Sequence, residues 1–338
     1  MYNHETNRER DANVDLLKIF ACIGVVGLHT LGSFELICGF SVPTFLLCTG
    51  FLLAKRKKTT IQKTWSRLLR LLKTVVLWSF LYLSFPRVFV NSPGWDECYP
   101  LTLLQTVGNA FIQRGMWQFW YFGALGLLYI LVQFADWVLP KVRIDRNRLK
   151  LTLWGLLLVF GAVLQIISYY YLHYPAQSIY IQTFRLWTWI QYYLMGNYLF
   201  HMKERLFIII PQKLDTIILI LLTAAAWLVQ CGAGKWLIDN LHTEYFYDDL
   251  VVAAWVFCFA LFILRLDVER FRWGITEVSK LTLGVYILHP FILEWVLSHF
   301  SIVTVPQHIL LFVSLTALSF LLSFLLNKVP VLRDFVRL

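Results

Sequence analysis

The chain has 338 residues, of which 59% are hydrophobic and 15% are charged, and its formal net charge is +10. So apolar a composition excludes both a soluble globular protein and a disordered one. The positive charge is scattered between apolar segments, which is typical of basic cytoplasmic loops and does not favour nucleic-acid binding.

The N-terminal stretch MYNHETNRERDAN is polar and is followed by a long apolar run. That run exceeds the apolar region of a signal peptide, and no small-residue cleavage site follows it. We therefore expect residues 1–13 to form a cytoplasmic head and the first helix to remain in the protein as an anchor.

Ten apolar segments follow, each close to the twenty residues that span the hydrocarbon core of a bilayer. They predict an all-α polytopic membrane protein: a single membrane-embedded domain with a ten-helix bundle over 14–327 and a cytoplasmic tail over 328–338. No soluble extracytoplasmic hydrolase-like domain is expected. The predicted segments are 14–32, 35–54, 66–89, 118–139, 150–171, 183–201, 214–230, 247–266, 280–298 and 307–327.

The basic residues predict the orientation of these segments. If the N-terminus is cytoplasmic, 26 of the 30 Lys and Arg residues fall inside, all except Arg87, Arg114, Arg185 and Lys235. So one-sided a distribution predicts that both termini are cytoplasmic.

The loops predicted to lie outside are mildly acidic and aromatic. Between Pro100 and Arg114 the apolar spacing predicts an amphipathic helix at the outer interface. Cys98 and Cys231 fall in outer loops, and whether they form a disulfide is left open. No Cys/His spacing typical of a metal site is present, so no metal is predicted.

The first segment, VDLLKIFACIGVVGLHTL, contains two ionisable residues, Lys18 and His29. Eleven residues of α-helix make three turns plus about 20°, so both side chains project from one face, about 16 Å apart along the axis. Ionisable groups are costly inside a membrane, which makes the pair a candidate functional site. The alternatives are a packing role for His29 and contact of Lys18 with lipid phosphates or Asp15.

Two further pairs are candidates. Arg67 and Arg70 are three residues apart at the start of the third segment, where they could bind phosphate or anchor the helix at the interface. His289 and Tyr286 share a face of the ninth segment and form a possible secondary site. Pro290 should kink that helix, so His289 could instead stabilise the kink.

The chain resembles the acyltransferase family 3 membrane acyltransferases over nearly its whole length. The first helix of that family carries Arg or Lys, ten residues, then His, matched here by Lys18 and His29, and its third helix opens with Arg-x-x-Arg, matched by Arg67 and Arg70. The strings SVPTFLLCTGFLL, FWYFGALGLLY and LGVYILHPFIL resemble further family segments, in the family's order.

The resemblance implies transfer of an acyl group, usually acetyl from acetyl-CoA, to a hydroxyl of an extracytoplasmic glycan or lipid-linked saccharide. His29 would be the catalytic residue, while Lys18, Arg67 and Arg70 would bind the donor. It also implies an integral protein of a bacterial plasma membrane. Many members carry an attached extracytoplasmic domain that completes transfer. Without one, this chain should act directly or pass the acyl group to a separate extracytoplasmic transferase.

Several alternatives stay open. A polytopic transporter or flippase of saccharides would also use intramembrane His and Arg, although no internal repeat is visible. A sensor or scaffold is a weaker alternative. Within the enzyme hypothesis, His29 could act as general base or carry the acyl group, and the group could be acetyl, succinyl or longer.

Overall fold

The computed structural model describes residues 10–55, 60–84, 102–112, 116–139 and 145–336, and all the regular elements in these ranges are helical. This confirms the all-α class. The longer helices are α1 (Ala12–Thr30), α2 (Ser41–Ala54), α3 (Ile61–Ser84), α5 (Leu103–Phe111), α6 (Trp120–Val138), α7 (Arg146–Ile167), α8 (Leu186–Ile209), α9 (Gln212–Trp236), α10 (Leu250–Arg265), α11 (Arg272–Ser279), α12 (Thr282–His299) and α13 (Val305–Lys328).

A helix lies at each of the ten predicted segments, but fewer have the length and composition of a membrane span. Six candidate spans contain α1, α2, α6, α7, α9 and α13, and α10 with the bent segment Glu269–Ser279 makes a seventh. The helices α3, α8 and α12 fall short of that measure. Charged residues in α3 and α8 lower their hydropathy. The count of ten and the cytoplasmic termini therefore stay predictions.

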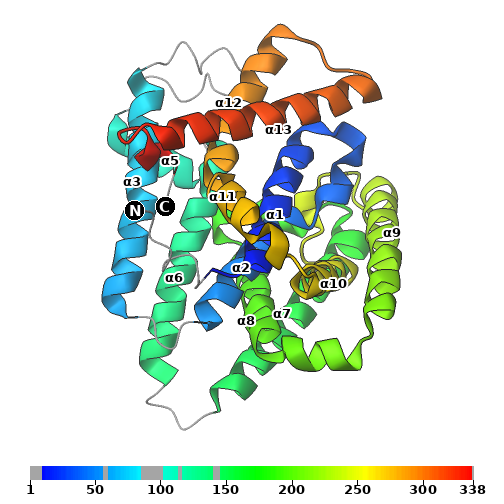
Figure 1. The fold of residues 1–338 in the computed structure, drawn as a ribbon. Coiled ribbons are helices and arrows are strands. Elements are labelled where there is room, and N and C mark those ends of the chain that lie inside the picture. The colour runs from blue at the N-terminus through cyan, green and yellow to red at the C-terminus, as the bar shows by residue number, and fades with distance from the viewer. Residues whose placement is uncertain (1–9, 56–59, 85–101, 113–115, 140–144, 337–338) are drawn as a thin grey trace.

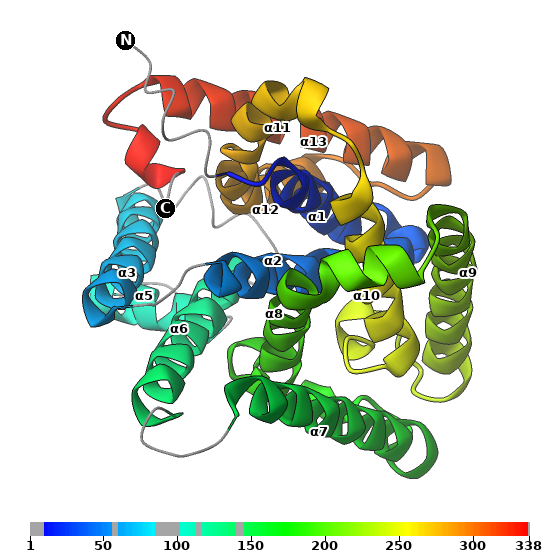
Figure 2. The same cartoon turned by 60° about the horizontal axis from the view of Figure 1, so that its bottom comes forward.

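Figures 1 and 2 show α3, α5 and α6 along one edge of the bundle and α9 along the opposite edge, with α1, α2 and α8 between them. The predicted amphipathic helix is present as α5, which begins with a capping box between Thr102 and Gln105. Cys231 lies within α9 and not in a loop, because that helix continues to Trp236. Cys98 lies outside the described residues, so whether the two cysteines form a disulfide stays open.

The closest helix contact in the centre is between α2 and α8. A methyl group added at Gly50 would overlap the backbone carbonyl of Tyr193, and one added at Gly196 would overlap the carbonyl of Leu47. Small residues let two helices approach backbone to backbone, which is how helices associate where the surrounding lipid is itself apolar. The two glycines therefore set the separation of α2 and α8.

The helix α1 is fixed at its start. Asp11 caps it by accepting a hydrogen bond from the Val14 amide. The side chain of Asn13 donates to the carbonyl oxygens of Ile263, at 2.8 Å, and of Leu266, at 2.7 Å, at the end of α10. These bonds join the start of α1 to the end of α10 and set the position of α1 relative to α10.

The segment between α9 and α10 is held by a buried carboxylate. Asp248 accepts hydrogen bonds from the Thr188 hydroxyl at 2.7 Å, from the Trp187 indole at 3.1 Å and from the Gln177 amide at 3.4 Å. Burial raises the pKa of the Asp248 carboxyl, and these hydrogen bonds oppose the shift. The next residue, Asp249, caps α10. The segment is thereby attached to α8 and α10 at a defined position.

We predict that Gly196→Ala lowers the thermal stability of the purified protein, because the added methyl forces α2 and α8 apart. The cost should be about 1–3 kcal/mol, as for other overpacked sites. Gly155→Ala on α7 is the matched control, since nothing lies within 4 Å of its added methyl. Thermal unfolding in detergent measures both, and an equal response of the two variants would contradict the predicted contact.

We predict that Asp248→Asn also destabilises the protein, because an amide nitrogen would face hydroxyl, indole and amide donors. The expected cost is about 1–3 kcal/mol, that of leaving buried hydrogen-bonding groups unpaired. Asp239→Asn is a control with no such buried network. Thermal unfolding of the two variants measures the difference in stability. Unchanged stability of Asp248→Asn would show that the hydrogen-bond network does not hold the segment.

Candidate active site

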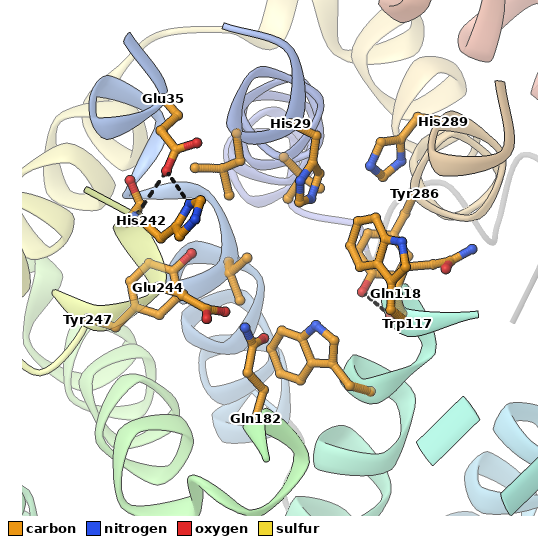
Figure 3. Close-up of a pocket in the computed structure, with 15 residues that line it drawn as sticks. His29, Glu35, Trp117, Gln118, Gln182, His242, Glu244, Tyr247, Tyr286 and His289 are labelled. Atoms are coloured by element: carbon orange, nitrogen blue, oxygen red, sulfur yellow. Dashed lines mark hydrogen bonds and ion pairs between the residues drawn. The ribbon is translucent and has the colours of Figure 1, made fainter. Parts of the chain in front are cut away.

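His29 lines a pocket of about 520 Å³ formed by α1, α12, the short helix Trp117–Phe119 and the segment before α10. We call it the His29 pocket. His29 is the last residue but one of α1. Its side chain is exposed and borders the pocket (Figure 3).

Three aromatic rings meet at one side of the His29 pocket. The ring centroids of His29 and His289 lie 5.6 Å apart at an interplanar angle of 21°, and Trp117 packs edge-on against His29 at 4.7 Å. His289 is fully buried, and its Nδ1 donates to the carbonyl oxygen of Val285 at 3.0 Å. In the neutral ring this leaves Nε2 as an acceptor, and it has no partner among the described residues.

Carboxylates line the same pocket. Glu35 accepts hydrogen bonds from the Thr243 amide and lies 3.3 Å from His242 Nδ1. Glu244 lines the pocket too, and the buried Arg185 guanidinium lies 3.9 Å from its Oε1. Neither Lys nor Arg is found among the described lining residues. The pocket therefore combines imidazoles, indoles and carboxylates.

Lys18 lines a second pocket of about 570 Å³, which we call the Lys18 pocket. Two other cations line it, Arg10 and Lys280. Asp15 is buried and accepts hydrogen bonds from Lys18 Nζ at 2.9 Å and from the Ser279 hydroxyl at 3.0 Å. Lys280 pairs with Glu277. Among the described residues, the three cations of this pocket thus form ion pairs with two carboxylates, Asp15 and Glu277. Neither carboxylate lines the pocket.

Tyr286 lines both pockets. Its hydroxyl donates to the backbone carbonyl of Gln118, a residue of the His29 pocket. The spacing of Lys18 and His29 on one helix face suggests a common cavity, but the two residues line two neighbouring pockets that share Tyr286. We call the Tyr286 side chain, which borders both pockets, the partition between them.

Arg67 and Arg70 lie on α3, outside the residues that line the two pockets. Their three-residue spacing does not give them a common environment. Arg67 is buried, with its guanidinium carbon 5.4 Å from the centre of the Tyr129 ring, whereas Arg70 is exposed and donates to the Ser66 carbonyl.

Sequence reasoning missed Arg10, Glu35, Trp117, His242 and Lys280 as site residues. A signal existed for Glu35, because a carboxylate inside a predicted span is itself a candidate functional group. The others lie in loops or at helix ends, where their residue types are common. Across the described ranges, no group of three His, Cys, Asp or Glu residues could hold a metal ion.

Comparison with known proteins identifies one family. The model of acyltransferase family 3, described as an acyltransferase domain, matches residues 11–328 and so includes both α1 and α12. No curated protein and no solved structure gives a significant match.

Proposed function

Because the chain belongs to acyltransferase family 3, we propose that this membrane acyltransferase moves an acyl group, most simply acetyl, from acyl-CoA to a hydroxyl of an extracytoplasmic glycan or lipid-linked saccharide. One observation carries the proposal: a cationic pocket and a pocket containing His29 adjoin each other and share Tyr286. Two substrates that enter from opposite sides could meet there.

The donor would occupy the Lys18 pocket. Coenzyme A carries several phosphates, and Arg10, Lys18 and Lys280 supply ammonium and guanidinium donors for them. Asp15 holds Lys18 at the wall of the pocket. The pantetheine arm would then extend toward Tyr286 and carry the thioester to the His29 side of the partition.

The acceptor would occupy the His29 pocket. The indoles of Trp117 and Trp120 offer flat apolar faces for sugar rings, and Glu35, Glu244 and Gln182 offer oxygens that accept hydrogen bonds from hydroxyl groups. These residue types suit a neutral saccharide better than an anionic one, since no Lys or Arg is among the described lining.

In the reaction, His29 accepts the proton of the acceptor's hydroxyl group while the hydroxyl oxygen bonds to the carbonyl carbon of the thioester. The tetrahedral intermediate then loses CoA as the carbon–sulfur bond breaks, and the thiolate takes up the proton that His29 carries. We propose that His289 and Tyr286 are a secondary site, in which His289 Nε2 accepts a hydrogen bond from the bound substrate.

The setting follows from the same proposal. The protein would lie in a bacterial plasma membrane, with acyl-CoA entering from the cytoplasm. It would transfer directly to its acceptor or through a separate extracytoplasmic transferase. It would need acetyl-CoA as substrate and no metal.

We predict that His29→Ala abolishes acyl transfer in lipid vesicles supplied with labelled acetyl-CoA and a panel of cell-envelope glycans. Loss of general-base catalysis alone costs about 10²- to 10⁴-fold. His289→Ala should retain measurable transfer. Full activity of His29→Ala, with normal membrane insertion, would exclude the proposed role.

The same assay separates the two mechanisms left open for His29. With acceptor withheld, a general base leaves the protein unlabelled, whereas an acyl-imidazole intermediate leaves label on the protein. Absence of CoA binding by the wild type would favour the transporter instead.

We predict that Lys18→Gln weakens binding of acetyl-CoA about 10-fold or more, because a charge-assisted hydrogen bond contributes about 1.5–3 kcal/mol. Isothermal titration measures the affinity, and Lys213→Gln on α9, which lines neither pocket, is the control. An unchanged affinity of Lys18→Gln would place the donor elsewhere. Titrating Arg67→Ala and Arg70→Ala beside it tests whether the donor also contacts α3, as the family pattern implies.

A further inference from the structure

A second cationic site lies away from both pockets, in a groove between α7 and α8. The groove has a volume of about 230 Å³ and is lined by ten described residues, none of them a carboxylate. Arg148, Lys150 and His201 lie among its lining residues, and apolar side chains such as Leu151 and Met202 provide the rest. We call it the α7–α8 groove.

The charge in this region exceeds what its ion pairs neutralise. Lys150 is half-buried and donates to the side-chain oxygen of Asn197 at 3.3 Å, which is a neutral partner. Arg148 Nε lies 3.5 Å from Asp145, whose other oxygen caps α7. Counting Arg146 in the same turn and Asp136, whose charge also acts on Lys150, three cations stand against two carboxylates among the described residues. The groove therefore favours an anion.

The position of the groove relates it to the membrane surface. The segment Arg146–Leu172 has the length and composition of a span, and only 17% of its apolar window is buried inside the protein. Exposed Leu156, Val159 and Val163 continue along α7. If α7 spans the membrane, its exposed apolar side would face lipid and its basic first turn would lie at the level of the lipid phosphates.

Trp154, which lines the groove, has a buried hydrogen-bond donor. The indole Nε1 of Trp154 is buried and has no acceptor among the described residues. The ring is held by Tyr198 at 5.2 Å and Phe257 at 6.4 Å, centroid to centroid. A buried donor without a partner is costly, so an acceptor oxygen from outside the chain would relieve it.

We propose that the α7–α8 groove binds an anionic phospholipid. The phosphate would lie between Lys150 and Arg148, a headgroup or ester oxygen would accept from Trp154, and the acyl chains would run down the exposed apolar side of α7. A basic pocket between helices at the membrane surface is the chemistry that recognises such headgroups. The inference does not depend on the proposed catalytic function.

The test is native mass spectrometry of the intact protein from phosphatidylcholine nanodiscs with a minor fraction of phosphatidylglycerol. Phosphatidylglycerol should remain bound in preference to phosphatidylcholine. Lys150→Gln should lower its affinity about fivefold, the factor expected for one Lys near an anionic membrane surface. Trp154→Phe, which keeps the aromatic ring and removes only the N–H, should lower the affinity as well.

Lys213→Gln is the matched control, since Lys213 is exposed and does not line the groove, and it should bind like the wild type. Glycerol phosphate is added as a soluble competitor. Competition as effective as that of the lipid would indicate a site for a soluble phosphate and overturn the proposal. No preference over phosphatidylcholine, or equal binding by Lys150→Gln and Lys213→Gln, would also overturn it.

Discussion

The arrangement of both pockets depends on the backbone contact between α2 and α8. At Gly50 and Gly196 no side chain separates the two helices. On one side, α1 packs against α2, where Gly24 leaves room for Ser41. On the other side, α8 supplies Thr188, whose hydroxyl binds Asp248 and thereby the segment that carries His242 and Glu244. The contact between α2 and α8 therefore positions two opposite walls of the His29 pocket.

The helix α1 contributes a different functional group to each pocket. Because α1 carries Lys18 and His29 on one face, it contributes a cation to one pocket and an imidazole to the other. The residues around each group differ accordingly. Cations surround the first, while carboxylates and indoles surround the second. Under the proposed function, this separation of charge suits an anionic donor in one pocket and a hydroxylated acceptor in the other.

The sequence predicts the helices well because each apolar run must satisfy its backbone hydrogen bonds internally. The number of spans stays a prediction, since charged residues in α3 and α8 lower the hydropathy of these two helices below that of a candidate span. The apolar run predicts one helix that carries both Lys18 and His29, and α1 includes both residues. It could not predict the partition, because the contact between Tyr286 and Gln118 joins residues 168 positions apart. For the same reason Arg10 and Lys280 reach the Lys18 pocket without any local pattern.

The partition at Tyr286 has a consequence for the membrane as well as for the chemistry. A bundle with a polar pocket on each side of one side chain would, if that side chain moved away with no substrate present, become a water-filled path for protons. The hydrogen bond from Tyr286 to the Gln118 carbonyl holds this side chain at the border of the two pockets. If the donor is the acyl-CoA that we propose, its pantetheine arm would itself fill any opening made at Tyr286, and the electrochemical gradient across the membrane would be preserved during turnover.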